Sequence, residues 1–457
     1  MPTGARGPEE GADEIDRLRL EVQRLHIELA EAKAREASRE ASLEQTLRRG
    51  ARQLVARARS RARGITRRLR GRADAPASTP ALPPPYVVKQ PPAPRADRPR
   101  VLHVIMNFYL GGSARLVVDL LEGLGHDYDQ RVVSCDLPPA PAYIGFPLTH
   151  HTLFTLDAAL DVLQRERPDL LHIHCLGHTR DKYGLRYWEW SRHWFAAAER
   201  LGIRVIENIN IPTEPFVSDA VACYVHVSDY VRETYGRRDG RHVTIYPGSD
   251  LAMFEPAAGA APADDVLGMV YRLWRDKLNE EAIDPFIEAI RRRPGTRALI
   301  VGDGVLLEAH RGRVAAAGLE RAFTFTGYAA YEALPALYAQ MSVFVAPVHT
   351  ESFGQVSPFA MGMKLPVIGY DVGAIPEIIG VSPGDSRDEA SLLAPPGDSA
   401  RLGAIAAALL DDRPRRIALG AANRARAERL FSVEAMVAAY EVLYQELAPS
   451  TARTPTP

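Results

Sequence analysis

The chain has 457 residues, of which 46% are hydrophobic, with 56 basic against 57 acidic side chains. This length exceeds one ordinary hydrophobic core, so we expect two or three domains, and the balanced charge argues against a polycation built for nucleic acid. The three cysteines, Cys135, Cys175 and Cys223, are widely spaced and odd in number, which favours a reducing compartment. No apolar run reaches the roughly 18 residues that span a bilayer, and residues 1–13 are acidic rather than signal-like, so we expect a soluble, cytoplasmic protein.

Residues 1–47 predict a short coiled-coil helix. Apolar residues recur there at alternating three- and four-residue steps, the heptad pattern of a dimer seam. The next two seam positions hold Ala32 and Glu36, so the alternative is a solvated helix with one apolar face. The seam residues, through which a homodimer could form, are Ile15, Leu18, Val22, Leu25 and Leu29.

Residues 48–75 form a basic segment, in which Arg48 to Arg72 includes no acidic residue. This segment could lie on an anionic membrane surface, where each basic side chain contributes about 1 kcal/mol, or it could simply stay solvated. Its lack of aromatic side chains argues against nucleic acid as a partner. Residues 76–99 are rich in proline and alanine and predict an extended linker.

Residues 100–250 predict a first α/β domain. The expected strands are 101–105, 170–175, 205–210 and 220–228, and the expected helices are 114–124 and 158–166. Gly111 and Gly112 follow the first strand directly and precede the first helix, a place where many strand-to-helix turns need glycine.

A histidine-rich strand end raises the question of a metal in this domain. His172 and His174 alternate onto one strand face, with Cys175 and His178 close behind them. The nearest carboxylate, Asp169, alternates onto the other face, and histidines are common at strand ends, so we predict no metal site.

Residues 251–431 predict a second α/β domain, followed by a helix at 432–448 and a disordered tail at 449–457. Arg272 lies in an expected strand at 269–273, and Lys277 follows five residues later. Two cations at the carboxyl end of a strand suit a diphosphate that gains negative charge, although a salt-bridged surface pair is the alternative. Further strands are expected at 298–304 and 323–328, and helices at 334–340 and 400–430.

The most informative stretch is His349 to Ile379. Apolar runs at 343–347 and 365–369 enclose a helix-length segment, which is the pattern of a βαβ unit in a parallel sheet. Glu351 falls where the first strand ends, and Gly354 allows a close approach of backbone to a ligand. The stretch therefore predicts a site for a phosphorylated ligand with one carboxylate beside it.

The same stretch resembles the signature of family-4 retaining glycosyltransferases, also described as glycosyl transferases group 1. The matching residues are Glu351-Ser352-Phe353-Gly354, Ala360-Met361, Gly362, Pro366-Val367-Ile368, Gly373 and Pro376-Glu377. The resemblance covers about residues 100–447 and implies a GT-B fold, an α/β architecture of two Rossmann-like domains facing a cleft. It also implies that the final helix crosses back onto the first domain.

The resemblance assigns roles to individual residues of the second domain. It implies that Glu351 orients the donor sugar, although a helix cap is the alternative, and that Arg272 and Lys277 stabilise the departing diphosphate. Position 359, eight residues after Glu351, holds Phe359 where the family has a ribose-binding glutamate. A phenyl ring accepts no hydrogen bond from a ribose, so this departure puts the geometry of donor binding, or even activity, in question.

Further donor-site and acceptor-side residues follow from the same resemblance. The donor site includes Gly111, Gly112, Ser352, Phe353 and Gly354, with Tyr328 stacked near the nucleotide base. The acceptor-side candidates are His174, His178, Asn208 and Asn210, the two asparagines standing in a loop where the family often has a histidine.

We therefore predict a retaining, hexosyl-type glycosyltransferase that uses a nucleotide diphosphate sugar and a glycan or lipid-linked acceptor in glycan or glycolipid synthesis. Fixed cations and helix dipoles would replace a metal, so no cofactor is expected. If the basic segment docks on a membrane, the enzyme would be peripheral on its inner face. The alternatives are a catalytically silent GT-B scaffold that regulates another transferase, and a sugar-nucleotide epimerase that acts without an acceptor.

Overall fold

The computed structural model describes residues 85–89, 98–109, 111–138, 142–175, 182–237, 239–257, 259, 263–382, 384 and 391–448. The expected coiled-coil helix, the basic segment, most of the linker and the C-terminal tail lie outside the described residues, and so does His178.

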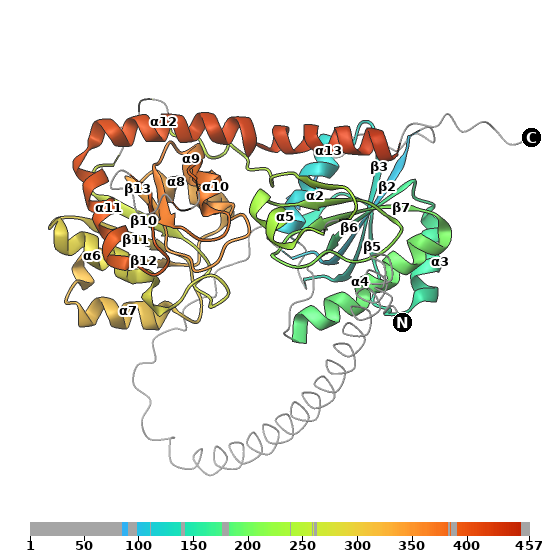
Figure 1. Ribbon diagram of the computed structural model, residues 1–457, viewed down its shortest axis with the longest axis horizontal. Coiled ribbons are helices and arrows are strands. Elements are labelled where there is room, and N and C mark those ends of the chain that lie inside the picture. Colours follow the sequence, from blue (N-terminus) through green and yellow to red (C-terminus); the bar gives the residue numbers. More distant parts are fainter. Residues whose placement is uncertain are drawn as a thin grey trace, which may run out of the picture. The chain divides into compact units, whose positions relative to one another are not determined.

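The first of two large sheets has seven strands, all parallel to their neighbours, in the order β5-β3-β2-β6-β7-β8-β9 (Figure 1). In chain order these are β2 (Arg100–Asn107), β3 (Asp129–Asp136), β5 (Leu148–His150), β6 (Leu170–Cys175), β7 (Arg204–Ile209), β8 (Val221–His226) and β9 (His242–Thr244). The helices between them are α2 (Gly112–Gly123), α3 (Leu156–Glu166), α4 (Lys182–Leu201) and α5 (Asp229–Tyr235). Each strand is reached through a crossover, which makes this a doubly wound α/β unit.

A short ribbon lies beside this unit. In it, β1 (Tyr86–Val87) pairs in parallel with β4 (Tyr143–Ile144). The Tyr86 hydroxyl donates to Glu122 of α2 at 3.0 Å, and Val88 is buried. Residues 86–88, in the middle of the predicted linker, therefore pack against this unit, with Tyr86 bonded to α2.

The second large sheet has six parallel strands in the order β12-β11-β10-β13-β14-β15. In chain order they are β10 (Val266–Val270), β11 (Arg297–Val301), β12 (Phe323–Gly327), β13 (Val343–Ala346), β14 (Val367–Tyr370) and β15 (Leu393–Ala394). The connecting helices are η2 (Glu280–Ile283), α6 (Asp284–Arg292), α7 (Leu307–Ala316), η3 (Glu320–Ala322), η4 (Tyr331–Ala333), α8 (Leu334–Tyr338), α9 (Val356–Gly362), α10 (Ile375–Ile379) and α11 (Ser399–Asp411).

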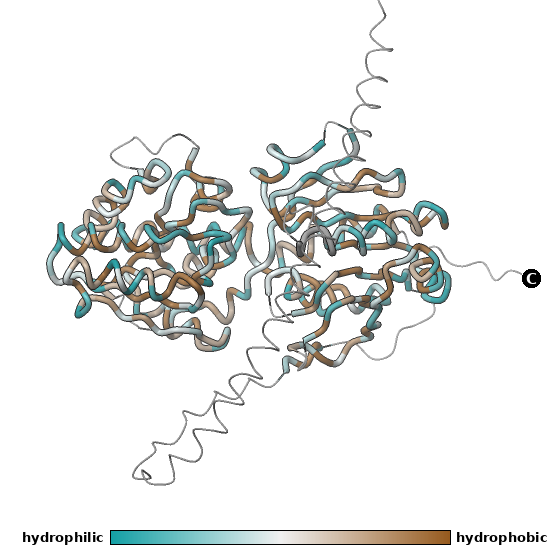
Figure 2. Tube along the Cα trace, turned by 90° about the horizontal axis from the view of Figure 1, so that it is seen from below, coloured by the Kyte–Doolittle hydropathy of each residue, from teal (hydrophilic) through white to brown (hydrophobic). Residues whose placement is uncertain are grey.

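Apolar runs explain why the strands occupy the interior. Every residue of β10, β13 and β14 is buried, as expected for parallel strands covered on both faces. Figure 2 shows the same pattern along the trace, with hydrophobic stretches toward the interior and hydrophilic ones toward the outside.

Two long helices, α12 (Arg413–Leu430) and α13 (Val433–Leu447), end the described chain. Met436, Tyr440 and Tyr444 of α13 are buried in one cluster with residues of the first sheet, including Val101 and Ile206. The final helix therefore packs on the first sheet, as the resemblance implied.

Two boundaries differ from the sequence-based expectation. The strand expected at 269–273 is β10, which ends at Val270, so Arg272 lies beyond the strand in a loop. The helix expected soon after Glu351 begins only at Val356, with Gln355 as its N-cap residue. The positive φ of Gly354, +80°, keeps this segment in a loop before the helix starts.

Candidate functional site

A buried ion pair lies at the carboxyl ends of β10 and β13. Lys277 Nζ is 2.6 Å from Glu351 Oε1, and the two side chains are 35% and 0% exposed. The same oxygen accepts a hydrogen bond from the Ser352 N–H at 3.1 Å. The lysine thus offsets the cost of burying the carboxylate and can face a ligand from its exposed side. Glu351 lies five residues before α9, and its carboxylate bonds neither the first turn of that helix nor the N-cap residue Gln355. Glu351 therefore makes no helix-capping contact with α9.

Two glycines shape the backbone around Glu351. Gly354 has a φ of +80°, and a Cβ there would lie 2.7 Å from Glu351 Oε2. Gly373, with a φ of +54°, packs so closely that a Cβ would lie 2.1 Å from the Glu351 carbonyl oxygen. The Ala374 N–H donates to that carbonyl at 3.0 Å. Glycine is therefore required at both positions to keep the Glu351 loop in this shape.

The glycine loop of the first sheet meets the loop that follows Glu351. A Cβ on Gly112, at the start of α2, would lie 3.0 Å from Gln355 Oε1. Gln355 Nε2 in turn donates to the Gly248 carbonyl at 3.1 Å. Gly111 gives the start of α2 no side-chain cap, so its first N–H groups remain available to an anion.

Arg272 lies apart from this ion pair. Its side chain is 76% exposed and pairs with Asp276 at 3.0 Å, so in this structure it makes the surface contact that was the alternative to phosphate binding. Surface pairs of this kind are weak, and a diphosphate could replace Asp276 as its partner.

Phe359 stacks on another aromatic ring. Its ring lies parallel to Phe254, with centroids 4.2 Å apart and an interplanar angle of 4°, and Tyr331 meets it edge-on at 5.7 Å. The side chain is 7% exposed. An aromatic stack therefore occupies the position for which the resemblance implies a ribose-binding carboxylate. Phe353 is likewise buried, near Tyr246 and Phe431, whereas Ser352 is half-buried.

Exposed apolar side chains follow three adjacent strands of the second sheet. Tyr328 is 64% exposed just after β12, Val305 is 57% exposed after β11, and Trp274 is 48% exposed after β10. Sequence reasoning named only Tyr328. The apolar side chains that follow the ends of neighbouring strands are the signal that could have identified the other two.

Arg115 and Asp119 of α2 form a further charged pair that the sequence motifs did not single out. Arg115 Nη2 lies 2.7 Å from Asp119 Oδ1 across one turn of α2, near the start of that helix. Burial raises the pKa of Asp119 to about 7 against the opposing effect of Arg115, and its Oδ2 is buried without a hydrogen-bond partner among the described residues. The spacing of four residues between opposite charges was visible in the sequence.

The acceptor-side candidates on the first sheet belong to a buried polar network. Asn208 Nδ2 donates to Asn210 Oδ1 at 2.6 Å, and the Tyr440 hydroxyl donates to Asn208 Oδ1. Asn210 Nδ2 is buried and has no partner in the described ranges of the chain. His174 is 1% exposed and lies 3.1 Å from His103. Asn210 Nδ2 and His174 Nδ1 are therefore the buried nitrogens of this group that have no partner among the described residues.

His103 joins His172 and His174 in a buried trio whose nearest ring nitrogens all lie within 4.8 Å of one another. Gln130 hydrogen-bonds His103 at 3.0 Å, and Tyr444 hydrogen-bonds His172 at 2.7 Å. Burial lowers the pKa of His103 to about 4 and keeps those of His172 and His174 well below their usual value. The trio is therefore neutral, and a divalent ion there would be buried with no anionic ligand from this group.

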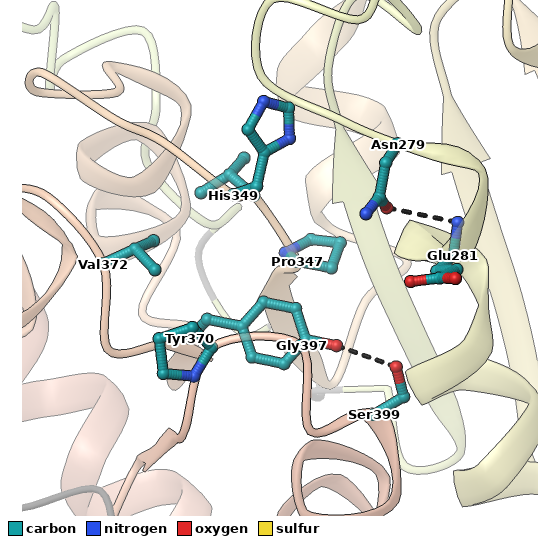
Figure 3. Close-up of a pocket in the computed structure, with 10 residues that line it drawn as sticks. Asn279, Glu281, Pro347, His349, Tyr370, Val372, Gly397 and Ser399 are labelled. Atoms are coloured by element: carbon teal, nitrogen blue, oxygen red, sulfur yellow. Dashed lines mark hydrogen bonds between the residues drawn. The ribbon is translucent and has the colours of Figure 1, made fainter.

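A small cavity of about 60 Å³ opens beside the second sheet (Figure 3). Pro347, Tyr370 and Val372 line it together with Asn279 and His349. The His349 N–H donates to the Lys277 carbonyl at 3.0 Å, so the cavity adjoins the chain that carries the ion pair. Glu351 is not one of its lining residues.

In the part of the chain that the structure describes, no helix is both long and apolar enough to cross a membrane.

Comparison with solved structures defines the class. A sucrose-phosphate synthase from Thermosynechococcus elongatus superimposes with a TM-score of 0.60 at 21% identity, covering 78% of this chain and 100% of that one. Anabaena Alr3699/HepE in complex with UDP gives a TM-score of 0.60 at 18% identity, covering 76% and 100%. Together with the two parallel α/β sheets, these likenesses show a GT-B fold.

Residues 264–412 match the family described as Glycosyl transferases group 1, as the Glu351 motif predicted. The lipopolysaccharide core biosynthesis mannosyltransferase LpsB of Rhizobium meliloti is 31% identical over 237 residues, which are 48% of this chain and 66% of that protein. The 2-deoxystreptamine N-acetyl-D-glucosaminyltransferase of Streptomyces fradiae is 30% identical over 258 residues, which are 54% and 58%. The chain thus spans about three fifths to two thirds of these relatives.

Proposed function

We propose that the protein transfers a sugar from a nucleotide diphosphate sugar to an acceptor hydroxyl and retains the anomeric configuration. The observation that carries this proposal is the ion pair of Glu351 and Lys277, 2.6 Å apart, with the carboxylate fully buried. Such a pair is costly to bury, and both of its residues lie in the stretch, 264–412, that matches the family.

In the proposed reaction the bond between the anomeric carbon and the diphosphate oxygen breaks, and the acceptor oxygen bonds to that carbon on the same face. The electron pair leaves with the diphosphate, whose departing oxygen takes up the proton that the acceptor hydroxyl loses. Lys277, Arg272 and the uncapped start of α2 would stabilise the leaving charge. Glu351 would orient the sugar through its hydroxyl groups, and Tyr328 would stack near the base. These fixed charges need no metal.

The acceptor would be a glycan or a lipid-linked molecule on the side of the first sheet. Support comes from relatives named for lipopolysaccharide core and phosphatidylinositol mannoside chemistry. Asn208, Asn210 and His174 line the polar network there, with His178 as a further candidate outside the described residues. If the basic segment at 48–75 docks the enzyme on anionic lipid, deletion of residues 1–75, which spares β1, should abolish binding to phosphatidylserine vesicles, and unchanged binding would refute that part.

Calorimetric titration with nucleoside diphosphates and nucleotide sugars tests the donor site. We expect one nucleotide to bind, with affinity reduced about tenfold or more in Lys277→Ala and Arg272→Ala, as for loss of a charged contact. Arg275→Ala is the matched control, since Arg275 lies in the same loop with its side chain 64% exposed. Transfer of the bound sugar to an acceptor would identify a transferase. Conversion of the sugar nucleotide with no acceptor present would identify an epimerase.

A silent GT-B scaffold is the second candidate, because Phe359 stacks on Phe254 where the resemblance implies a ribose contact. Failure of every nucleotide to bind the wild-type protein would favour this candidate. A mass measurement in solution with and without residues 15–29 would show whether the predicted seam forms a homodimer.

A further inference from the structure

Three buried polar atoms near Glu351 have no hydrogen-bond partner in the described part of the chain. They are Glu351 Oε2, the Tyr271 hydroxyl and Ser357 Oγ. Their residues are 1%, 6% and 0% exposed. A buried polar atom without a partner costs free energy, and three such atoms in one domain call for an explanation.

The three atoms come from segments that converge on the ion pair. Tyr271 directly precedes Arg272 after β10, and Ser357 lies in the first turn of α9, six residues after Glu351. Burial and the charge of Glu351 both raise the pKa of Tyr271, and a side-chain hydrogen-bonding interaction with Ser357 opposes them. The phenol therefore lies within the electrostatic reach of both groups.

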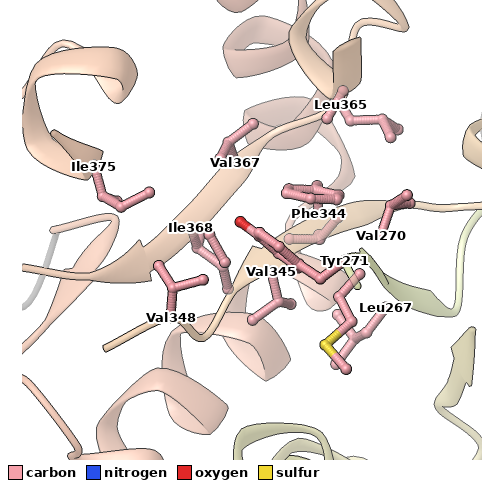
Figure 4. Close-up of a cluster of buried hydrophobic side chains, with 14 of the residues drawn as sticks. Leu267, Val270, Tyr271, Phe344, Val345, Val348, Leu365, Val367, Ile368 and Ile375 are labelled. Atoms are coloured by element: carbon pink, nitrogen blue, oxygen red, sulfur yellow. The ribbon is translucent and has the colours of Figure 1, made fainter. Parts of the chain in front are cut away.

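The surroundings of Tyr271 are otherwise apolar. Figure 4 shows its ring among Phe344, Val345 and Ile368, and the Phe344 ring centroid is 6.2 Å away. A phenylalanine would fill the same space without burying a hydroxyl. The hydroxyl is therefore of use to polar groups that act on the phenol, and Ser357 and Glu351 are two such groups.

We propose that Tyr271 and Ser357 are positioning residues for Glu351: their hydroxyls, with one buried water between them, bind Oε2 and hold the carboxylate so that Oε1 stays on Lys277. A water fits this role because a buried water needs two to four polar partners, and the described residues supply three unused ones. The carboxylate then keeps one fixed orientation, which a contact with a donor hydroxyl requires. The role in donor binding rests on the proposed function, whereas the positioning of Glu351 does not.

A thermal-stability cycle tests the positioning without any ligand. Tyr271→Phe should lower the unfolding midpoint by about 2–4 °C, because a water-bridged contact is lost. In a Glu351→Met background, which lacks both carboxylate oxygens, the same substitution should lower it far less. Tyr370→Phe is the matched control, since Tyr370 is a buried tyrosine of the same domain that bonds Ser399 at 2.9 Å, and its effect should be equal in both backgrounds.

The opposite result overturns the inference. If the phenol has no partner, Tyr271→Phe removes an unpaired buried hydroxyl, so the midpoint should rise or stay constant. An equal loss in the Glu351→Met background would also refute it. Ser357→Ala with Tyr271→Phe should cost less than the sum of the single losses, because both remove partners of one water.

A binding measurement then separates positioning from the proposed function. Tyr271→Phe should weaken binding of the nucleotide sugar severalfold but leave binding of the matching nucleoside diphosphate unchanged, because Glu351 addresses the sugar. An equal effect on both ligands would refute the link to the donor sugar. If the wild-type protein binds neither, the proposed function fails while the stability cycle still decides the positioning.

Discussion

The carboxylate of Glu377, in α10, accepts a hydrogen bond of 2.7 Å from the hydroxyl of Tyr246. It also accepts from the N–H groups of Asp229 and Tyr230 at 2.7 and 2.9 Å, at the start of α5. A side chain from the second sheet's unit therefore satisfies the first turn of a helix that belongs to the first sheet's unit. Burial and the hydrogen bond to Glu377 raise the pKa of Tyr246, which keeps the phenol protonated as the donor.

Removal of this contact should loosen the packing of α5 on α10. We expect Glu377→Ala to lower the free energy of unfolding by about 2 kcal/mol, because it removes several hydrogen bonds to one charged group. Urea titration followed by tryptophan fluorescence measures the change. Glu308→Ala is the control, since Glu308 is 81% exposed, and an equal loss in both variants would contradict the assignment.

Lys277→Ala should destabilise the protein as well as weaken donor binding. The substitution leaves Glu351 buried without its cation, and we expect a loss of about 2 kcal/mol, less than for a fully buried pair because Lys277 is 35% exposed. Lys364→Ala, at an exposed lysine of the same domain, is the control. In a Glu351→Met background the loss should nearly vanish, and its persistence would show that the pair is not the cause.

Gly373→Ala and Gly312→Ala should have opposite effects on stability. Gly373 has a φ of +54° and no room for a Cβ, which would lie 2.1 Å from the Glu351 carbonyl oxygen, so we expect a loss of at least about 2 kcal/mol. Gly312 lies within α7, and a Cβ added there would meet no described atom within 4 Å, so alanine should stabilise by about 0.5–1 kcal/mol. Thermal unfolding of both variants measures the contrast, and a neutral Gly373→Ala would show that the Glu351 loop can adjust.

Acid should destabilise the fold through His103. Burial lowers its pKa from 6.5 in an exposed side chain to about 4, so the unfolded chain binds the proton first as the pH falls. The free energy of unfolding should therefore decrease between pH 6.5 and pH 4, by about 3 kcal/mol from this residue at 1.4 kcal/mol per pH unit. Urea midpoints across this range measure the slope. His103→Gln should flatten this dependence of stability on pH. An unchanged slope would mean that other groups, such as His172, His174 or His226, cause the dependence.

Local sequence patterns predicted much of the fold. The strands at 170–175 and 205–210 and the helix at 433–447 were recognisable because apolar residues recur with the period of each element. The motif from Glu351 to Gly354 was recognisable because a carboxylate and a glycine follow a buried strand. Gly354 indeed takes a positive φ, which is a local property of its residue type.

The sequence by itself determined the match to the family, the place of several strands and helices, and the residue types available to the site, since all of these depend on neighbours along the chain. The tertiary structure alone decided which of those residues meet. Lys277 pairs with Glu351 across 74 positions, and His172 bonds Tyr444 across 272. It also placed Phe359 on Phe254. Such contacts follow from strand order and side-chain packing between distant segments, and no local periodicity encodes them.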